Sequence, residues 1–156
     1  MAARGEAVGS GDGALAEPSR AGLCCAAPMF RLVLVCAGGA LGSGARYLVG
    51  GWVAAAVGAS FPFGTLLINA VGSFFISVVM YLGLSAGAIG PELRLFLAVG
   101  ILGGFTTYSS FNYEMLALAQ RGAWLLAVGY GAATLFGCLL AGGLGLAAAR
   151  GLAGAG

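Results

Sequence analysis

Four long apolar segments limit what this chain can fold into. They cover roughly residues 32–56, 62–84, 95–119 and 124–148, and each has about the 20 residues that an α-helix needs to cross a bilayer. Only 8% of the 156 residues are charged, whereas soluble domains are about a quarter charged. A soluble fold of this size cannot bury so much apolar surface. We therefore predict an all-α integral membrane protein with four transmembrane helices.

The two ends of the chain differ from these segments. Residues 1–28 are rich in Gly and Ala, and they lack the charged start, apolar run and cleavage site of a signal peptide. They are either a disordered tail or a stretch upstream of the true translation start, for which Met29 is the candidate. We expect the membrane domain to span residues 30–150 and residues 151–156 to form a short C-terminal tail.

The few ionisable residues exclude several functions. A net charge of +2 does not indicate a basic surface for nucleic-acid binding. The absence of His removes the usual base that would activate a nucleophile. We therefore expect neither nucleic-acid binding nor an enzyme. The arginines are nearly balanced between the two sides of the predicted bundle: Arg31, Arg94 and Arg150 against Arg121 and Arg46. So small a bias permits insertion in both orientations, and hence antiparallel dimers.

Polar side chains recur every four residues along two of the predicted helices, so that they share a helix face. These residues are Thr65, Asn69, Ser73 and Ser77 in the second segment, and Tyr130, Thr134 and Cys138 in the fourth. Such a face usually meets a partner or a watery cavity, but Ser and Thr can also bond back to their own helix. The Asn69 amide needs partners for both of its polar groups, so that a role in a pore and a role in packing both remain open.

Small residues and single charges mark other positions inside the apolar segments. Gly38 and Gly42 are spaced for close helix packing. Arg46 either extends to an interface or forms a positive vestibule. Glu114 either pairs near a helix end or lines a path.

The stretch GGFTTYSSF, residues 103–111, interrupts the third segment. Its glycine pair and its threonines weaken a helix, which indicates either a break or an unbroken helix that packs closely. A break would free carbonyl groups that need protein, water or an ion as partners. Carbonyl oxygens suit a hard cation such as Na⁺, whereas Ser109, Ser110 and the positive ring edge of Phe111 suit a small anion. These residues predict an ion site without identifying the ion.

Three motifs, GGALGSGARY (38–47), GTLLINAVGSF (64–74) and GGFTTYSSF (103–111), resemble the signature segments of the Fluc family of fluoride channels, also called CrcB. The resemblance covers about residues 30–150. It implies a fluoride-specific channel in the cell (inner or plasma) membrane, which lowers fluoride toxicity by passive export of F⁻. It also implies an antiparallel, dual-topology homodimer whose third helices are broken at mid-membrane.

The same resemblance implies the residues of the site. A structural Na⁺ at the dimer centre would be held by the carbonyls of Gly103 and Thr106. The fluoride pathway would contain Arg46, Asn69, Tyr108, Ser109, Ser110, Phe111, Tyr130 and Thr134. Tyr108 stands where the family has Phe, which leaves the effect of its hydroxyl group open.

Two other functions compete with this interpretation. A small dual-topology, proton-coupled multidrug exporter would need a carboxylate in the membrane, preferably in the first helix, which has none. Glu114 follows the predicted break instead. A purely structural membrane subunit would pack through the same glycines and transport nothing.

Overall fold

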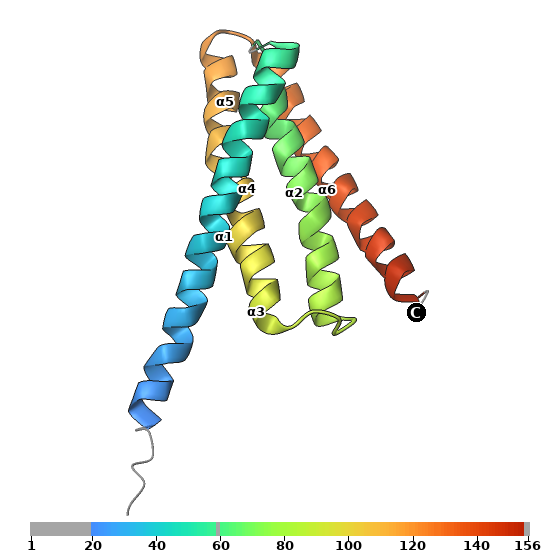
Figure 1. The fold of residues 1–156 in the computed structure, drawn as a ribbon. Coiled ribbons are helices and arrows are strands. Elements are labelled where there is room, and N and C mark those ends of the chain that lie inside the picture. Colours follow the sequence, from blue (N-terminus) through green and yellow to red (C-terminus); the bar gives the residue numbers. More distant parts are fainter. Residues whose placement is uncertain (1–19, 59, 155–156) are drawn as a thin grey trace, which may run out of the picture.

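The computed structural model describes residues 20–58 and 60–154, and these are almost entirely helical, with no strand among them. Three helices are long and apolar enough to cross a membrane: α1 (Arg20–Val57), α2 (Phe63–Leu84) and α6 (Trp124–Gly154) (Figure 1). Many of their large apolar side chains are exposed in the single chain, Trp52 by 82% and Leu125 by 88%. Such exposure is expected of helices that face lipid. The all-helical class predicted from the sequence is confirmed.

The helix ends follow the predicted segments closely, except at the two ends of the chain. α1 begins at Arg20, so residues 20–28, which we expected to lie in a tail, continue the first helix. Residues 1–19 lie outside the described part of the chain, and the start at Met29 stays a prediction. At the other end, α6 continues to Gly154.

The third predicted helix is divided into two halves. The first half consists of α3 (Pro91–Arg94), the π-helix η1 (Leu95–Leu102) and α4 (Gly103–Phe105), and the second half is α5 (Tyr108–Gln120). Between them Thr106 (φ −77°, ψ 156°) and Thr107 (φ −150°, ψ 116°) are extended. Neither half reaches the roughly 20 residues of a spanning helix. The predicted break is confirmed, and it lies at the two threonines.

Local chemistry explains where the chain leaves the helix and where it re-enters it. Thr106 and Thr107 are β-branched and have low helix propensity. Thr107 then caps α5, because its hydroxyl oxygen accepts a hydrogen bond from the Ser110 N–H at 3.2 Å. Threonine is a favoured N-cap for this reason. The π-helix that precedes the break is a rare form, found often at functional sites.

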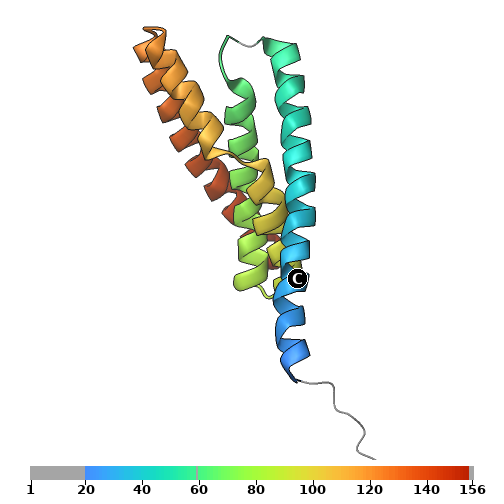
Figure 2. The ribbon, with the colours of Figure 1, turned by 90° about the vertical axis from the view of Figure 1, so that its left-hand side faces the viewer.

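The break also changes the packing partner of the chain. η1 and α4 pack against α1, whereas α5 packs against α6. Figure 2 shows the two halves, yellow and orange, running in different directions on either side of the break. Helix α2 packs against α6 and also contacts η1, α4 and α5. Side chains of α2 can therefore hold both halves.

Backbone approaches backbone where α1 meets η1 and α4. A Cβ atom built on Gly38 would lie 2.8 Å from a carbonyl oxygen of η1, and one on Gly104 would lie 2.6 Å from the carbonyl oxygen of Gly39. A Cβ atom on Gly42 would overlap the carbonyl of Ile101. The small-residue packing predicted for Gly38 and Gly42 is confirmed, because no side chain fits at either position.

Gly42→Ala is expected to destabilise the fold by about 1–3 kcal/mol or more, because the added methyl group has to push the η1 backbone away. The melting temperature of the purified protein in detergent measures this effect. Gly44→Ala is the matched control, since a Cβ atom at Gly44 meets nothing within 4 Å, and this variant should melt like the parent. Equal losses in the two variants would contradict the packing argument.

Candidate functional site

Asn69 of α2 binds the backbone at the helix break. Its Nδ2 donates to the carbonyl oxygen of Thr107 at 3.0 Å, and its Oδ1 accepts from the Thr107 N–H at 2.8 Å. The break leaves these two backbone groups without helical partners, so the amide replaces the bonds that a helix would have made. One Nδ2 hydrogen remains for a further acceptor. Asn69 thus braces the break, a contact that its sequence position alone did not reveal.

The other polar residues of the α2 face divide into two kinds. Ser73 donates to the Asn69 carbonyl at 2.7 Å and Ser77 donates to the Ser73 carbonyl at 3.1 Å, so both bond back to their own helix. Thr65 instead donates across to Glu114 of α5 at 2.7 Å. Only the N-terminal half of the polar face, Thr65 and Asn69, connects α2 to the broken helix.

Three hydroxyl groups gather at the start of α5. The Thr107 Oγ1 lies 3.3 Å from the Ser109 Oγ and donates to the Ser110 Oγ at 3.0 Å. Thr107 is buried, Ser110 is half-buried and Ser109 is exposed. We did not predict Thr107 as a site residue, although it anchors this cluster. Its position as a threonine three residues before Ser110 at a helix start is an N-cap signal that could have identified it.

Glu114 joins three helices. One carboxylate oxygen accepts from the Thr65 hydroxyl at 2.7 Å, and the other accepts from the Tyr130 hydroxyl of α6, also at 2.7 Å. Tyr130 is completely buried. Glu114 is thus paired with two hydroxyl groups in the middle of α5, and it also lines the cavity described below, so both interpretations that the sequence left open remain.

Thr134 lies on the same face of α6 as Tyr130. Its hydroxyl is buried and has no hydrogen-bond partner among the described residues. A buried polar group without a partner is uncommon and calls for an explanation, such as a water molecule or an ion.

Aromatic rings form a short row beside the break. The ring centroids of Tyr108 and Phe111 are 5.7 Å apart, and those of Phe111 and Tyr130 are 5.2 Å apart. Phe111 is half-buried, whereas Tyr108 is 78% exposed in the single chain. The structure therefore brings Phe111 to the polar face of α6 and leaves Tyr108 at the surface.

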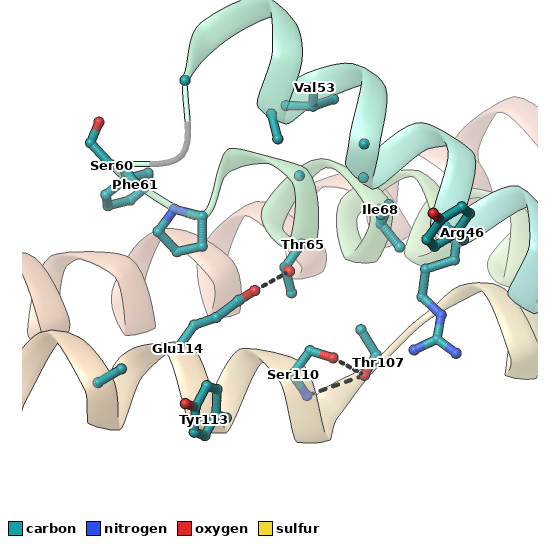
Figure 3. A pocket seen from close by; sticks show the side chains of 18 of the residues that line it. Arg46, Val53, Ser60, Phe61, Thr65, Ile68, Thr107, Ser110, Tyr113 and Glu114 are labelled. Carbon is teal, nitrogen blue, oxygen red and sulfur yellow. Dashed lines mark hydrogen bonds between the residues drawn. The ribbon is translucent and has the colours of Figure 1, made fainter.

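A cavity of about 900 Å³ opens between α1, α2 and α5 (Figure 3). Its polar lining includes Ser43, Arg46, Ser60, Thr65, Thr107, Ser110, Glu114 and Arg121. The side chain of Arg46 extends from α1 toward the segment that carries Thr107 (Figure 3). Arg46 forms no ion pair with any residue of the described chain. No carboxylate of the described chain at salt-bridge distance therefore neutralises the positive charge that Arg46 brings to the cavity.

The carbonyl groups around the break offer oxygen atoms to a ligand. Among residues 20–58 and 60–154, no donor forms a hydrogen bond to the carbonyl oxygen of Gly103 or Thr106. The hydroxyl and the N–H of Thr106 both donate to the Leu102 carbonyl, at 2.9 Å and 3.0 Å. In the same part of the chain, no group of three or more His, Cys, Asp or Glu residues is placed to hold a metal. For a cation, the break thus offers carbonyl oxygens as ligands.

The predicted site residues lie in three places. Gly103, Thr106, Tyr108, Ser109, Ser110 and Phe111 belong to the break and the first turn of α5, with Asn69 bound to them. Tyr130 and Thr134 belong to α6, and Phe111 contacts Tyr130. Arg46 lies across the cavity on α1.

The fold and the site define a multi-pass helical membrane protein in which a broken helix gathers polar side chains. The model of the family described as CrcB-like protein, Camphor Resistance (CrcB), matches residues 33–146, and the chain belongs to this family.

Three relatives, each named fluoride-specific ion channel FluC, illustrate the similarity. A relative from Anaeromyxobacter sp. (strain K) is 58% identical over 113 residues, which cover 72% of this chain and 90% of the relative. A relative from Thermus thermophilus is 54% identical over 112 residues, which cover 71% of this chain and 87% of the relative. A relative from Geobacter metallireducens is 44% identical over 122 residues, which cover 78% of this chain and 98% of the relative.

Proposed function

We propose that this chain forms a fluoride-specific ion channel that lets F⁻ leave the cell passively. The observation that carries the proposal is the match to relatives named as such channels, at 44–58% identity over 87–98% of their length. The broken helix and its polar neighbours support it, because they place hydrogen-bond donors inside an apolar bundle. Since those relatives are named ion channels, we expect conduction and not catalysis.

The donors near the break suit a small anion. Fluoride is strongly hydrated, and a pore has to replace its water with other donors while binding the ion weakly enough to release it. Ser109, Ser110 and the remaining Nδ2 hydrogen of Asn69 can donate on the α5 side. The hydroxyl of Thr134, which has no partner in the described chain, can donate on the α6 side. Between these donors, the electropositive ring edges of Phe111 and Tyr108 can contact the ion without offering a full charge.

Arg46 has a different part in the proposal. It lines the cavity from α1 and has no carboxylate partner in the described chain. A cation at the mouth of a cavity raises the local concentration of anions. We therefore assign Arg46 to an electropositive vestibule and not to the narrow part of the path.

We further propose four membrane crossings, the third made by the two halves that meet at mid-membrane, and an antiparallel dual-topology homodimer. The exposure of Gly103 and Tyr108 at the break supports a second copy at this surface. The weak arginine bias supports insertion in both orientations.

A structural Na⁺ at the centre of this dimer fits the donor set of the break. Hard cations bind oxygen ligands, and the carbonyl oxygens of Gly103 and Thr106 have no competing donor among the described residues. When bound, Na⁺ would supply the positive charge that draws carbonyl groups of two subunits together. Within one chain, Asn69 and the Thr107 cap hold the break in the extended form that presents these oxygens.

Removing Na⁺ is expected to reduce dimer stability and fluoride flux. The measurement compares protein purified and reconstituted in Na⁺ with protein handled throughout in N-methylglucamine salts. Cross-linked dimer yield and fluoride efflux are then read in parallel. If both quantities are unchanged, the Na⁺ proposal is contradicted, whereas the fluoride proposal is left standing.

The central experiment is fluoride efflux from liposomes that contain the purified protein, followed with a fluoride electrode, with chloride as the control ion. Fast F⁻ flux without Cl⁻ flux is the expected result. Phe111→Ile should abolish it by removing a ring edge at the break. Phe136→Ile, at a side chain that is 66% exposed on α6, is the matched control and should conduct normally. No flux from a well-folded dimer would contradict the proposed function, unless Tyr108→Phe restores it.

Nothing in the relatives' names supports the proton-coupled exporter that the sequence left open. Its required carboxylate would have to be Glu114, and two hydroxyl groups already occupy that side chain.

A further inference from the structure

A second cavity, of about 350 Å³, lies at the other end of α1 and α2. Two arginines, Arg31 of α1 and Arg94 of α3, stand among its lining residues. Its apolar lining includes Met80, Leu95, Ala98 and Val99. The cavity therefore combines two guanidinium groups with the apolar surfaces of α2 and η1.

The charged and apolar parts of this cavity lie at different depths. Arg31 stands near the start of the apolar stretch Pro28–Val57, and Arg94 stands at the start of the third segment. Ala98 and Val99 follow Arg94 by about one helical turn, which places them deeper in the membrane. The cations thus lie near the membrane–water interface, and the apolar wall extends toward the hydrocarbon.

Arg94 carries a charge that no carboxylate balances among the described residues, where the one ion pair is Arg31 with Glu92. Its Nη1 donates to the carbonyl oxygen of Gly83 at 3.4 Å, which leaves its other N–H groups free for a ligand. A Cβ atom on Gly83 would lie 2.7 Å from the Arg94 Cδ. The glycine therefore makes room for the stem of this arginine and helps to fix it at the edge of the cavity.

Arg31 is held less firmly. Its Nη2 donates to the Glu92 Oε1 at 3.1 Å, but the two side chains are 57% and 45% exposed. Exposed ion pairs contribute little stability. The hydrogen bond from Arg31 lowers the pKa of Glu92, so this carboxylate is ionised at neutral pH. A bound anion would therefore compete with Glu92 for Arg31.

We propose that this cavity binds an anionic phospholipid, with its phosphate on Arg94 and Arg31 and an acyl chain along Leu95 and Val99. Guanidinium groups bind phosphate oxygens in a bidentate manner, and basic pockets between transmembrane helices suit anionic headgroups. A free phosphate ion would leave the apolar wall unused. A zwitterionic lipid carries its own cation, which would compete with the arginines for the lipid phosphate. This site is independent of the ion that the protein carries.

The test measures how many lipids the purified protein retains in detergent micelles that contain equal amounts of phosphatidylglycerol and phosphatidylcholine, by native mass spectrometry. The parent protein should retain phosphatidylglycerol in preference. Arg94→Gln should weaken this retention about fivefold, the effect of removing one arginine near an anionic headgroup. Arg121→Gln, which removes an arginine at the other end of the bundle, should leave retention unchanged.

Glu92→Gln tests the proposal in the opposite direction. It frees Arg31 and removes a negative charge beside the phosphate, so the retention of phosphatidylglycerol should rise. A misfolded protein could not give this gain. The proposal is overturned if the parent protein shows no preference for phosphatidylglycerol, if Glu92→Gln fails to raise retention, or if Arg94→Gln and Arg121→Gln reduce it equally. Displacement of the lipid by an equal concentration of glycerol phosphate would also overturn it, in favour of a free-anion site.

Discussion

Asn69→Leu should abolish fluoride flux and lower the free energy of unfolding by about 2–6 kcal/mol. Leucine has a similar size but leaves both the N–H and the carbonyl of Thr107 without a partner. Each buried, unsatisfied backbone group costs about 1–3 kcal/mol. Liposome efflux measures the flux, and denaturation in detergent measures the stability.

Three further substitutions show what the amide does. Ser73→Ala removes only a bond from a side chain to its own helix and is the matched control. Asn69→Asp keeps an acceptor for the Thr107 N–H but loses the donor, so its stability should lie between those of the parent and Asn69→Leu. Ser110→Ala removes a hydroxyl beside the break and leaves the Asn69 bridge in place. If Asn69→Leu stops flux without any loss of stability, the amide serves the ion directly and the bracing role is contradicted.

The second large effect is expected at Glu114. Glu114→Ala should cost about 3–6 kcal/mol of stability, because it leaves the hydroxyls of Thr65 and Tyr130 without their shared acceptor. Hydrogen bonds to charged groups contribute about 1.5–3 kcal/mol each. The loss should appear as a lower denaturation midpoint of the purified protein.

A double-mutant cycle separates this network from simple packing. Tyr130→Phe keeps the buried ring and removes only the hydroxyl group, and Glu114→Gln keeps the size of the side chain. The two substitutions should show a coupling energy of about 0.5–3 kcal/mol, as expected of residues in one hydrogen-bond network. Strictly additive effects would mean that the 2.7 Å contact between Tyr130 and Glu114 contributes no stability.

Local patterns in the sequence predicted much of this architecture. The apolar segments predicted α2 and α6, because a run of this length has to be helical to satisfy its own backbone in lipid. The glycine pair and the threonines predicted the break, since both act through local backbone preferences. The spacing of Gly38 and Gly42 predicted close packing, because small residues four positions apart share a helix face and let another backbone approach.

Features that depend on distant parts of the chain were not predicted. The binding of Asn69 to Thr107 joins residues 38 positions apart, and that of Thr65 to Glu114 joins residues 49 apart. Such contacts require the relative rotation of two helices, which no single segment specifies. The four-residue period placed Ser73 and Asn69 on one face but did not show that, of these two, Asn69 reaches across whereas Ser73 bonds to its own helix. The beginning of α1 at Arg20 was missed because the residues that precede Met29 show no apolar period.

The π-helix η1 determines which way the chain faces when it reaches the break. A π-helical turn holds an extra residue compared with an α-helical turn, and such turns behave like single-residue insertions in an α-helix. One residue corresponds to a rotation of about 100° and an advance of about 1.5 Å. If one residue were deleted from η1 and the segment became α-helical, Thr107 would turn away from Asn69 and the Gly103 carbonyl would point in a new direction. One additional residue upstream of the break thus sets the direction in which the residues of the break face.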